Sequence, residues 1–275
     1  MSKDKAEKKK HSKMFKLLVG LLIALGVFEL AAFGALAYYL SDYSHADATA
    51  EKALKSTDAV TVVDTDDWIE FTPAAAAGDS DAADVSDSDA TDAGDSGMTG
   101  IVFYPGGKVE DAAYAPLMMD FAEKGYFCAV VHMPFNLAIL DSNAAKDVKD
   151  AHPEITNWLI GGHSLGGLMA AKYAAISDFD GLFLLASYSN TDLSDKQIAV
   201  VSVYGDKDGV LNMNDYNSAK SNLPPDTIEY VIKGGNHAQF GSYGAQDGDG
   251  KATISADDQR AETVKAVLEN IAGAQ

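Results

Sequence analysis

A serine flanked by glycines stands between an apolar run and a helical run near the middle of the chain. The segment Gly161–Gly167 reads Gly-Gly-His-Ser-Leu-Gly-Gly, and Gly162, Ser164 and Gly166 fill the pattern G-x-S-x-G. In this pattern the serine lies on a sharp turn from strand to helix, where the residues two before and two after it must be small. The turn exposes the hydroxyl and directs the amide of Leu165 and the positive end of the new helix at the group attacked. The pattern therefore predicts that Ser164 is a nucleophile.

A serine nucleophile needs a base, and the base needs an acid to orient it. Asp206 and Asp208 both follow an apolar run, and we favour Asp208 because it lies further into the loop and Gly209 allows a sharp turn after it. Of the six histidines, His237 follows the last predicted strand and completes the chain order serine, acid, histidine. We therefore predict a triad of Ser164, Asp208 and His237, with Asp206 as the alternative acid.

Acyl transfer also needs two backbone donors for the developing oxyanion. Leu165 supplies one in this fold class, and the loop after the first central strand supplies the other. In that loop Pro105 has no N–H, so Gly106 and Gly107 are the candidates. Three further residues near these loops are candidates for lining the pocket: Lys108, His132 and Asn136. We expect His163, which adjoins the nucleophile, to serve packing.

The elements that must position these residues alternate between strand and helix. Apolar and β-branched runs predict strands over 59–63, 68–72, 100–104, 126–133, 158–160, 181–186, 198–204 and 227–232. Helices are predicted over 112–124, through a stretch that ends at Val148, and over 168–176, 213–221 and 256–271. This alternation predicts an α/β fold with a mostly parallel sheet and helices on both faces. About 20 residues separate Ala186 from Asp208, too few for a separate lid domain. Loops at the carboxyl ends of the strands then carry the chemistry.

The amino-terminal part has a different composition. Residues 1–16 carry seven lysines and form a basic head, and residues 17–40 are almost wholly apolar, long enough to cross a bilayer. Glu29 is the one charged residue in this span, and the cost of inserting it is outweighed by the surrounding apolar residues. Because the lysines precede the span, we expect a single-pass protein of the cell membrane. Its amino terminus would lie in the cytoplasm and its catalytic domain outside the cell. The alternative is a signal peptide cleaved near Ala37, which would release a secreted protein.

The remaining chain divides into a juxtamembrane helix or linker at 41–56 and a catalytic domain at 57–275. Within that domain, residues 74–97 contain seven aspartates and no lysine or arginine, which predicts a solvated, disordered loop. The loop does not fit a calcium-binding EF-hand, which needs a glycine and a terminal glutamate at fixed positions.

Charge and cysteine content exclude some classes of function. The net charge of −20 divides into +5 on residues 1–16 and −25 on the rest, so nucleic acid is not an expected partner. The single cysteine, Cys128, lies in an apolar run, which excludes an internal disulfide or a cysteine-built metal site and favours a buried hydrophobic role. No metal or organic cofactor is needed by the predicted mechanism.

Four segments together resemble a family of small bacterial α/β-hydrolases related to the dienelactone hydrolases: Phe103–Glu110, Met133–Ala138, Gly161–Gly167 and Gly235–Gly241. The resemblance runs from about Thr57 to the carboxyl terminus. It implies a compact α/β-hydrolase fold and a Ser164–Asp208–His237 triad. Dienelactone hydrolases themselves use a cysteine nucleophile, so their lactone substrate does not carry over to this serine.

The expected function is therefore hydrolysis of a small carboxylic ester through an acyl-enzyme, by a membrane-anchored serine hydrolase. The same triad also serves thioesterases, peptidases and acyltransferases. From another class, a catalytically silent hydrolase fold could act as an anchored binding module. The sequence leaves the acyl and alcohol groups and the oligomeric state open.

Overall fold

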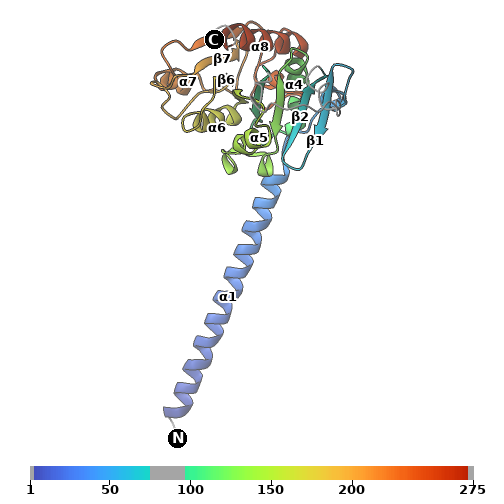
Figure 1. Ribbon diagram of the computed structural model, residues 1–275. Coiled ribbons are helices and arrows are strands. Elements are labelled where there is room, and N and C mark those ends of the chain that lie inside the picture. The colour runs from blue at the N-terminus through green and yellow to red at the C-terminus, as the bar shows by residue number, and fades with distance from the viewer. Residues whose placement is uncertain (1–2, 75–96, 272–275) are drawn as a thin grey trace. The chain divides into compact units, whose positions relative to one another are not determined.

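The computed structural model describes residues 3–74 and 97–271 and divides the chain into two units, residues 1–42 and residues 43–275 (Figure 1). Nearly all of the predicted Asp-rich loop at 74–97 lies outside the described residues.

The first unit is one helix, α1 (Lys3–Ser41). Its segment Lys13–Tyr39 is long and apolar enough to cross a membrane, a property that signal sequences near an amino terminus share. Side chains along it, such as those of Leu22 and Leu30, are exposed. The helix thus has the composition expected of the predicted span at 17–40.

The second unit is built on an eight-stranded sheet in the order β1-β2-β4-β3-β5-β6-β7-β8. The strands are β1 (Val60–Asp64), β2 (Trp68–Pro73), β3 (Thr99–Tyr104), β4 (Phe127–Val131), β5 (Asn157–His163), β6 (Gly181–Leu185), β7 (Ala199–Gly205) and β8 (Ile228–Ile232). Strands β1 and β2 run antiparallel to each other and β2 to β4, whereas the remaining neighbours are parallel. All the predicted strands are present, and the mostly parallel sheet is confirmed.

Helices connect the strands. They are α2 (Ala48–Ala53), α4 (Ala115–Ala122), α5 (Ala145–Ala151), α6 (Leu165–Ala174), α7 (Met213–Ala219) and α8 (Ala256–Ile271). Single 3₁₀ turns occur at η1 (Asp111–Tyr114), η2 (Pro134–Asn136), η3 (Ala138–Leu140), η4 (Lys220–Asn222) and η5 (Ala238–Phe240).

The helical stretch predicted after β4 is wrong in its first half. Phe135 and Asn136 have left-handed backbones, with φ of 55° and 56°, so the chain forms two 3₁₀ turns before α5 begins. Asn136 O accepts a hydrogen bond from the Lys108 amide at 2.8 Å. In a continuous helix this carbonyl would instead bond an amide of the next turn. This segment therefore folds to meet the loop after β3.

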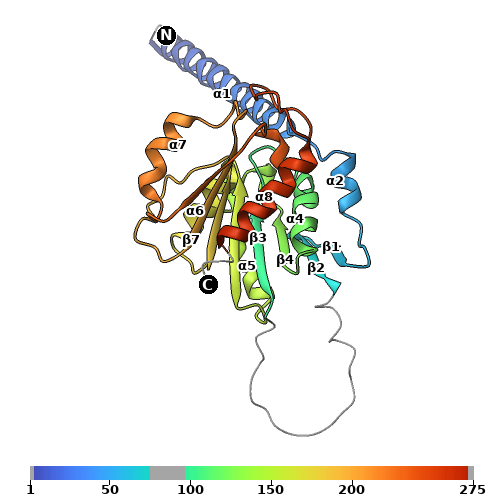
Figure 2. The same cartoon turned by 90° about the horizontal axis from the view of Figure 1, so that it is seen from above.

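Helices cover both faces of the sheet, and alternate residues of each strand enter different cores. On β3, Ile101 and Phe103 join the core beneath α4 and α8, whereas Val102 and Tyr104 join the core beneath α5 and α6. Figure 2 shows α4 and α8 together on one side of the strands. Because both faces are buried, the strands are rigid supports, and their carboxyl ends meet along one edge of the sheet.

The second unit begins at Tyr43, ahead of the predicted domain start at residue 57. Ser44 donates its amide to Lys108 O at 2.8 Å and accepts from the Glu110 amide at 2.9 Å. Asp47 caps α2 by accepting from two amides, and α2 packs against α4. The segment predicted as a juxtamembrane linker is thus packed into the unit from its third residue.

Candidate active site

Ser164 occupies a strained turn between β5 and α6. Its φ of 52° and ψ of −120° lie in a region that non-glycine residues rarely adopt, and such strain concentrates at functional sites. A Cβ on Gly162 would lie 2.5 Å from the Gly166 carbonyl carbon, and one on Gly166 would meet the backbone oxygens of Tyr104 and Pro105. Only glycine fits at either place, which explains the two glycines of the motif physically.

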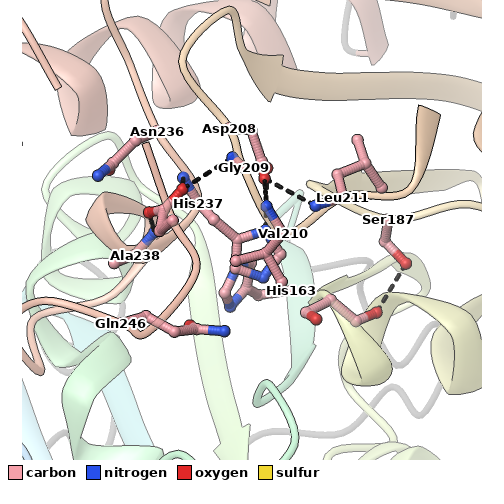
Figure 3. Close-up of polar contacts among 12 residues, drawn as sticks. His163, Ser187, Asp208, Gly209, Val210, Leu211, Asn236, His237, Ala238 and Gln246 are labelled. Carbon is pink, nitrogen blue, oxygen red and sulfur yellow. Dashed lines mark hydrogen bonds and ion pairs between the residues drawn. The ribbon is translucent and has the colours of Figure 1, made fainter. Parts of the chain in front are cut away.

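Neighbouring groups hold this turn in position. The Ser164 amide donates to Leu185 O at 2.9 Å, which continues the pairing of β5 with β6. The Ser187 hydroxyl donates to Ser164 O at 2.7 Å and is drawn at the side of the site in Figure 3. The strained residue is therefore fixed from both of its peptide groups.

His237 and Asp208 form a buried pair. His237 Nδ1 lies 2.9 Å from Asp208 Oδ2, and the two side chains are 1% and 2% exposed. Asp208 Oδ1 accepts from the amides of Val210 and Leu211, each at 2.8 Å (Figure 3). Both carboxylate oxygens are thus engaged, which fixes the orientation of the acid and, through it, of the imidazole ring.

The outer nitrogen of His237, the predicted base, is left without a partner. Since Nδ1 faces a carboxylate, it carries the proton, and His237 Nε2 carries the lone pair. Nε2 is buried and has no hydrogen-bond partner among residues 3–74 and 97–271. An unpaired buried nitrogen costs free energy and calls for an explanation, and among the described residues His163 Nε2 is in the same state. The ring of His163, the residue before Ser164, lies 4.5 Å from that of His237, centroid to centroid.

Asp206 points elsewhere. Its Oδ1 accepts from the Gly234 amide at 2.7 Å, and this hydrogen bond is the main cause that lowers the pKa of the carboxyl group. The structure therefore brings Asp208, and not the alternative acid, to His237.

The two candidate oxyanion donors after β3 differ in their hydrogen bonding. The Gly106 amide donates to the Tyr114 hydroxyl at 3.0 Å, so it already has an acceptor in this structure, and its service as an oxyanion donor stays a prediction. For the Gly107 amide the described part of the chain supplies no acceptor. A Cβ on Gly107 would lie 2.9 Å from Leu165 Cδ2, which shows how closely this loop approaches the start of α6. Leu165 opens that helix, so its amide has no carbonyl of its own helix to bond.

His163 is a support for the loop, as its packing role predicts. The Tyr114 hydroxyl accepts from the Gly106 amide and is hydrogen-bonded to His163 Nδ1 at 2.8 Å. Burial and, after it, the neighbouring His237 lower the pKa of His163, which keeps the ring neutral. Tyr114 was not singled out from the sequence, because nothing in its helical surroundings marks the hydroxyl as a link between two loops.

The three candidates for pocket lining are Lys108, Asn136 and His132, and the first two meet at the loop after β3. Lys108 has a φ of 58° and joins Asn136 through the backbone hydrogen bond already described. His132 is held by the carboxylates of Asp111 and Asp64 and by Thr65 O, and its hydrogen bond to Asp111 is the main cause that raises its pKa to about 9. It makes no hydrogen bond to the triad. Contact of these three residues with a substrate stays a prediction.

Within residues 3–74 and 97–271, no group of three or more histidine, cysteine or acidic side chains is placed to hold a metal ion. A hollow of about 580 Å³ lies beside the loop of His237, and its lining includes Asn236, Gln246, Asp249 and Arg260. None of the three triad residues lines it.

Comparison with known proteins places these residues in a wider context. A family model described as "Alpha/beta hydrolase family" matches residues 100–261, which include Ser164, Asp208 and His237. No curated protein matches the chain.

Several solved structures are similar in fold. A putative lipase from Acinetobacter baumannii has a TM-score of 0.53 at 11% identity, over 82% of this chain and 95% of its own. A thermophilic esterase from Thermogutta terrifontis has a TM-score of 0.46 at 15% identity, over 76% of this chain and 91% of its own. A monoacylglycerol lipase from Paleococcus ferrophilus has a TM-score of 0.49 at 10% identity, over 62% of this chain and 94% of its own. At 11% identity the likeness to the first of these concerns the fold alone.

Proposed function

This chain belongs to the alpha/beta hydrolase family and has that fold, and on this premise we propose that it is a serine hydrolase that cleaves carboxylic esters. The observation that carries the proposal is the buried His237–Asp208 pair, which leaves a bare Nε2 on the loop that packs against the strained serine turn.

In the first step, His237 acts as general base. Asp208 holds Nδ1–H at 2.9 Å, so Nε2 is free to accept the proton of Ser164 Oγ as the hydroxyl turns toward it. The serine oxygen then bonds to the ester carbonyl carbon, and the carbonyl π electrons move to the oxygen. Asp208 stabilises the imidazolium that forms, without itself taking the proton.

The developing oxyanion is held by the amides of Leu165 and Gly107. Both are backbone groups on rigid supports, so little reorganisation is needed as charge appears. The amino-terminal end of α6 adds its partial positive charge at the same place.

Collapse of the tetrahedral adduct breaks the bond to the alcohol, which leaves with the proton from His237. His237 then takes a proton from water, the resulting hydroxide attacks the acyl-enzyme, and the acid is released as Ser164 recovers its proton. No step calls for a metal or an organic cofactor.

The proposal includes attachment to the membrane. The apolar segment of α1 and the lysines that precede it support a retained single-pass anchor, with the amino terminus in the cytoplasm and the catalytic unit outside.

Covalent labelling by a fluorophosphonate probe tests the catalytic proposal. The full chain in detergent should be labelled, and Ser164→Ala should lose labelling and about 10³-fold or more of its activity toward p-nitrophenyl acetate. Ser187→Ala removes the neighbouring hydroxyl but leaves the nucleophile, so it should still be labelled.

Failure of the wild-type chain to react with the probe would favour a catalytically silent binding module. Labelling without ester turnover would instead point to another acyl-transfer reaction, which thioester and peptide substrates would then identify.

A further inference from the structure

One segment between η5 and α8 contacts both of the loops that carry Asp208 and His237. We call residues 242–255, between η5 and α8, the strap; the acid loop is 206–211 and the base loop is 233–238. A Cβ on Gly209 would lie 2.5 Å from Gly248 O, and one on Gly250 would meet the Lys207 carbonyl. The strap and the acid loop therefore touch backbone to backbone, at positions where only glycine fits.

The carboxylate of Asp249, at the centre of the strap, accepts four backbone hydrogen bonds. Its Oδ1 accepts from the amides of Gly209 at 3.0 Å, His237 at 3.2 Å and Gly250 at 2.8 Å. Its Oδ2 accepts from the amide of Ala238 at 2.9 Å. One side chain thus bonds the residue after the proposed acid and the proposed base itself; Figure 3 shows Gly209 and Ala238 next to His237.

The two loops are joined near the sheet by other means. The Asp206 amide donates to Ile232 O at 3.0 Å, and the Lys207 amide donates to Gly235 O at 2.9 Å. The buried Gln259 side chain of α8 holds the peptide groups of Asn236 from both sides, at 2.9 and 2.8 Å. These contacts end just before Asp208 and His237. Beyond them, Asp249 joins the two loops, and the Asn236 side chain also donates to Gly250 O of the strap at 2.8 Å.

We propose that Asp249 is a positioning residue, which keeps the acid loop and the base loop at the separation that the His237–Asp208 hydrogen bond requires. The proposal rests on the proposed function of the triad, because Asp249 contacts only the backbone of the loops that carry it. A carboxylate suits this position because amide donors converge on both of its oxygens, and hydrogen bonds to an ionised acceptor are the stronger kind.

The experiment compares Asp249→Ala, Asp249→Asn and the matched control Asp247→Ala in the full chain in detergent. Asp247 lies on the same strap, is exposed and makes none of these bonds. We expect Asp249→Ala to lower kcat for p-nitrophenyl acetate about 10- to 100-fold with KM changed less than about 3-fold, because misplacing the base costs rate more than binding. Asp249→Asn keeps an oxygen for three donors and turns an NH₂ group toward the Ala238 amide, so a smaller loss is expected. Asp247→Ala should match the wild type.

A second readout does not depend on turnover. We expect the proton between His237 Nδ1 and Asp208 Oδ2 to give a far-downfield ¹H NMR resonance, which Asp208→Ala should identify by removing it. This resonance should broaden or vanish in Asp249→Ala and persist in Asp247→Ala, whereas a strap that merely stabilises the fold would leave it in place in any folded variant. If Asp249→Ala fails to fold, Asp249→Asn gives the decision by the same two readouts.

The proposal is overturned if a folded Asp249 variant keeps both the resonance and a kcat within about 3-fold of the wild type. Absence of probe labelling and turnover in the wild-type chain would instead sink the proposed function, while the resonance would still report whether Asp249 positions the pair.

Discussion

His132 shows how a single side chain can make stability depend on pH. Its ring lies between the carboxylates of Asp111 and Asp64 and is 28% exposed, so it is partly shielded from solvent. The hydrogen bond to Asp111 raises the pKa of the ring from 6.5 to about 9. A raised folded-state pKa means that the folded protein binds this proton more tightly than the unfolded chain does. The stabilisation is therefore complete below about pH 6.5 and is lost as the pH rises through about 9.

Replacing this histidine tests the sign. The free energy of unfolding of the wild type should exceed that of His132→Gln by about 1 kcal/mol at pH 6, once solvent screening is allowed for, and by little at pH 10. Urea titrations at the two pH values measure the difference. In an Asp111→Asn background the pH dependence should largely disappear; an unchanged dependence would show that Asp111 is not its source.

Tyr114 links the loop after β3 to His163, the residue before the proposed nucleophile, and removing its hydroxyl should affect both stability and rate. Tyr114→Phe leaves the buried Gly106 amide and His163 Nδ1 unpaired, at a cost of about 1–3 kcal/mol in the free energy of unfolding. The loop carrying Gly107 would then be less well placed, so kcat should fall as well. Urea unfolding and ester turnover measure the two effects.

Tyr173 provides the control for this change, because its side chain is also buried and its hydroxyl makes no hydrogen bond to the described residues. Tyr173→Phe should change neither quantity appreciably. Equal effects of the two substitutions would contradict the linking role of Tyr114.

Residue types and chain order indicate Ser164, Asp208 and His237, because few combinations of side chains can perform acyl transfer. They do not distinguish Gly106 from Gly107, since the choice depends on which amide Tyr114 engages. They give no sign of Asp249 either. Its partners are backbone amides, and only the tertiary fold brings those to a carboxylate far along the chain.

At the scale of elements, the turn from β5 to α6 depends on close backbone contacts. Gly166→Ala would drive a Cβ into the carbonyl oxygens of Tyr104 and Pro105, which belong to β3 and the loop after it and cannot swing aside as a side chain would. We expect a loss of at least about 2 kcal/mol in the free energy of unfolding and loss of probe labelling.

Gly125→Ala gives a contrasting case in the same unit. Gly125 has a φ of 93°, but the space around its Cβ position is open. The substitution should therefore cost only backbone strain of about 1 kcal/mol, and the variant should still be labelled by the probe. A fully active Gly166→Ala would show that the turn tolerates what its geometry excludes.

Strands were easier to predict than the connections between them. Apolar runs buried on both faces leave a clear signal, and all eight strands lie where the sequence indicates. The segment after β4 misled the prediction because its composition permits a helix, whereas its backbone is fixed by the contact of Asn136 with Lys108. Such a contact is distant in sequence and leaves no local pattern.

At the scale of the whole molecule, the chain combines a catalytic unit with an apolar helix, and the orientation predicted for that helix can be measured. Cys128 is the only cysteine and is fully buried, so an introduced cysteine can be labelled without background. Asp226→Cys, at an exposed position of the catalytic unit, should react with a membrane-impermeant maleimide in intact spheroplasts. Ser12→Cys, in the basic head, should react only after permeabilisation.

The same pair of variants separates an anchor from a signal peptide. A retained helix keeps the Ser12→Cys label on a chain of 29.0 kDa in the membrane fraction. Cleavage would remove that label and release a shorter chain that Asp226→Cys still marks. Labelling of Asp226→Cys only after permeabilisation would reverse the orientation.

The direction of β2 has a practical consequence. Because β2 runs antiparallel to β4, Pro73 lies near the start of the parallel strands, where Thr99 also begins β3. Ser164 lies at the opposite ends of those strands. A domain inserted between Pro73 and Thr99 would therefore lie at the end of the sheet opposite to Ser164. A fluorescent protein inserted there should leave ester turnover intact, so this junction is suited to domain insertion.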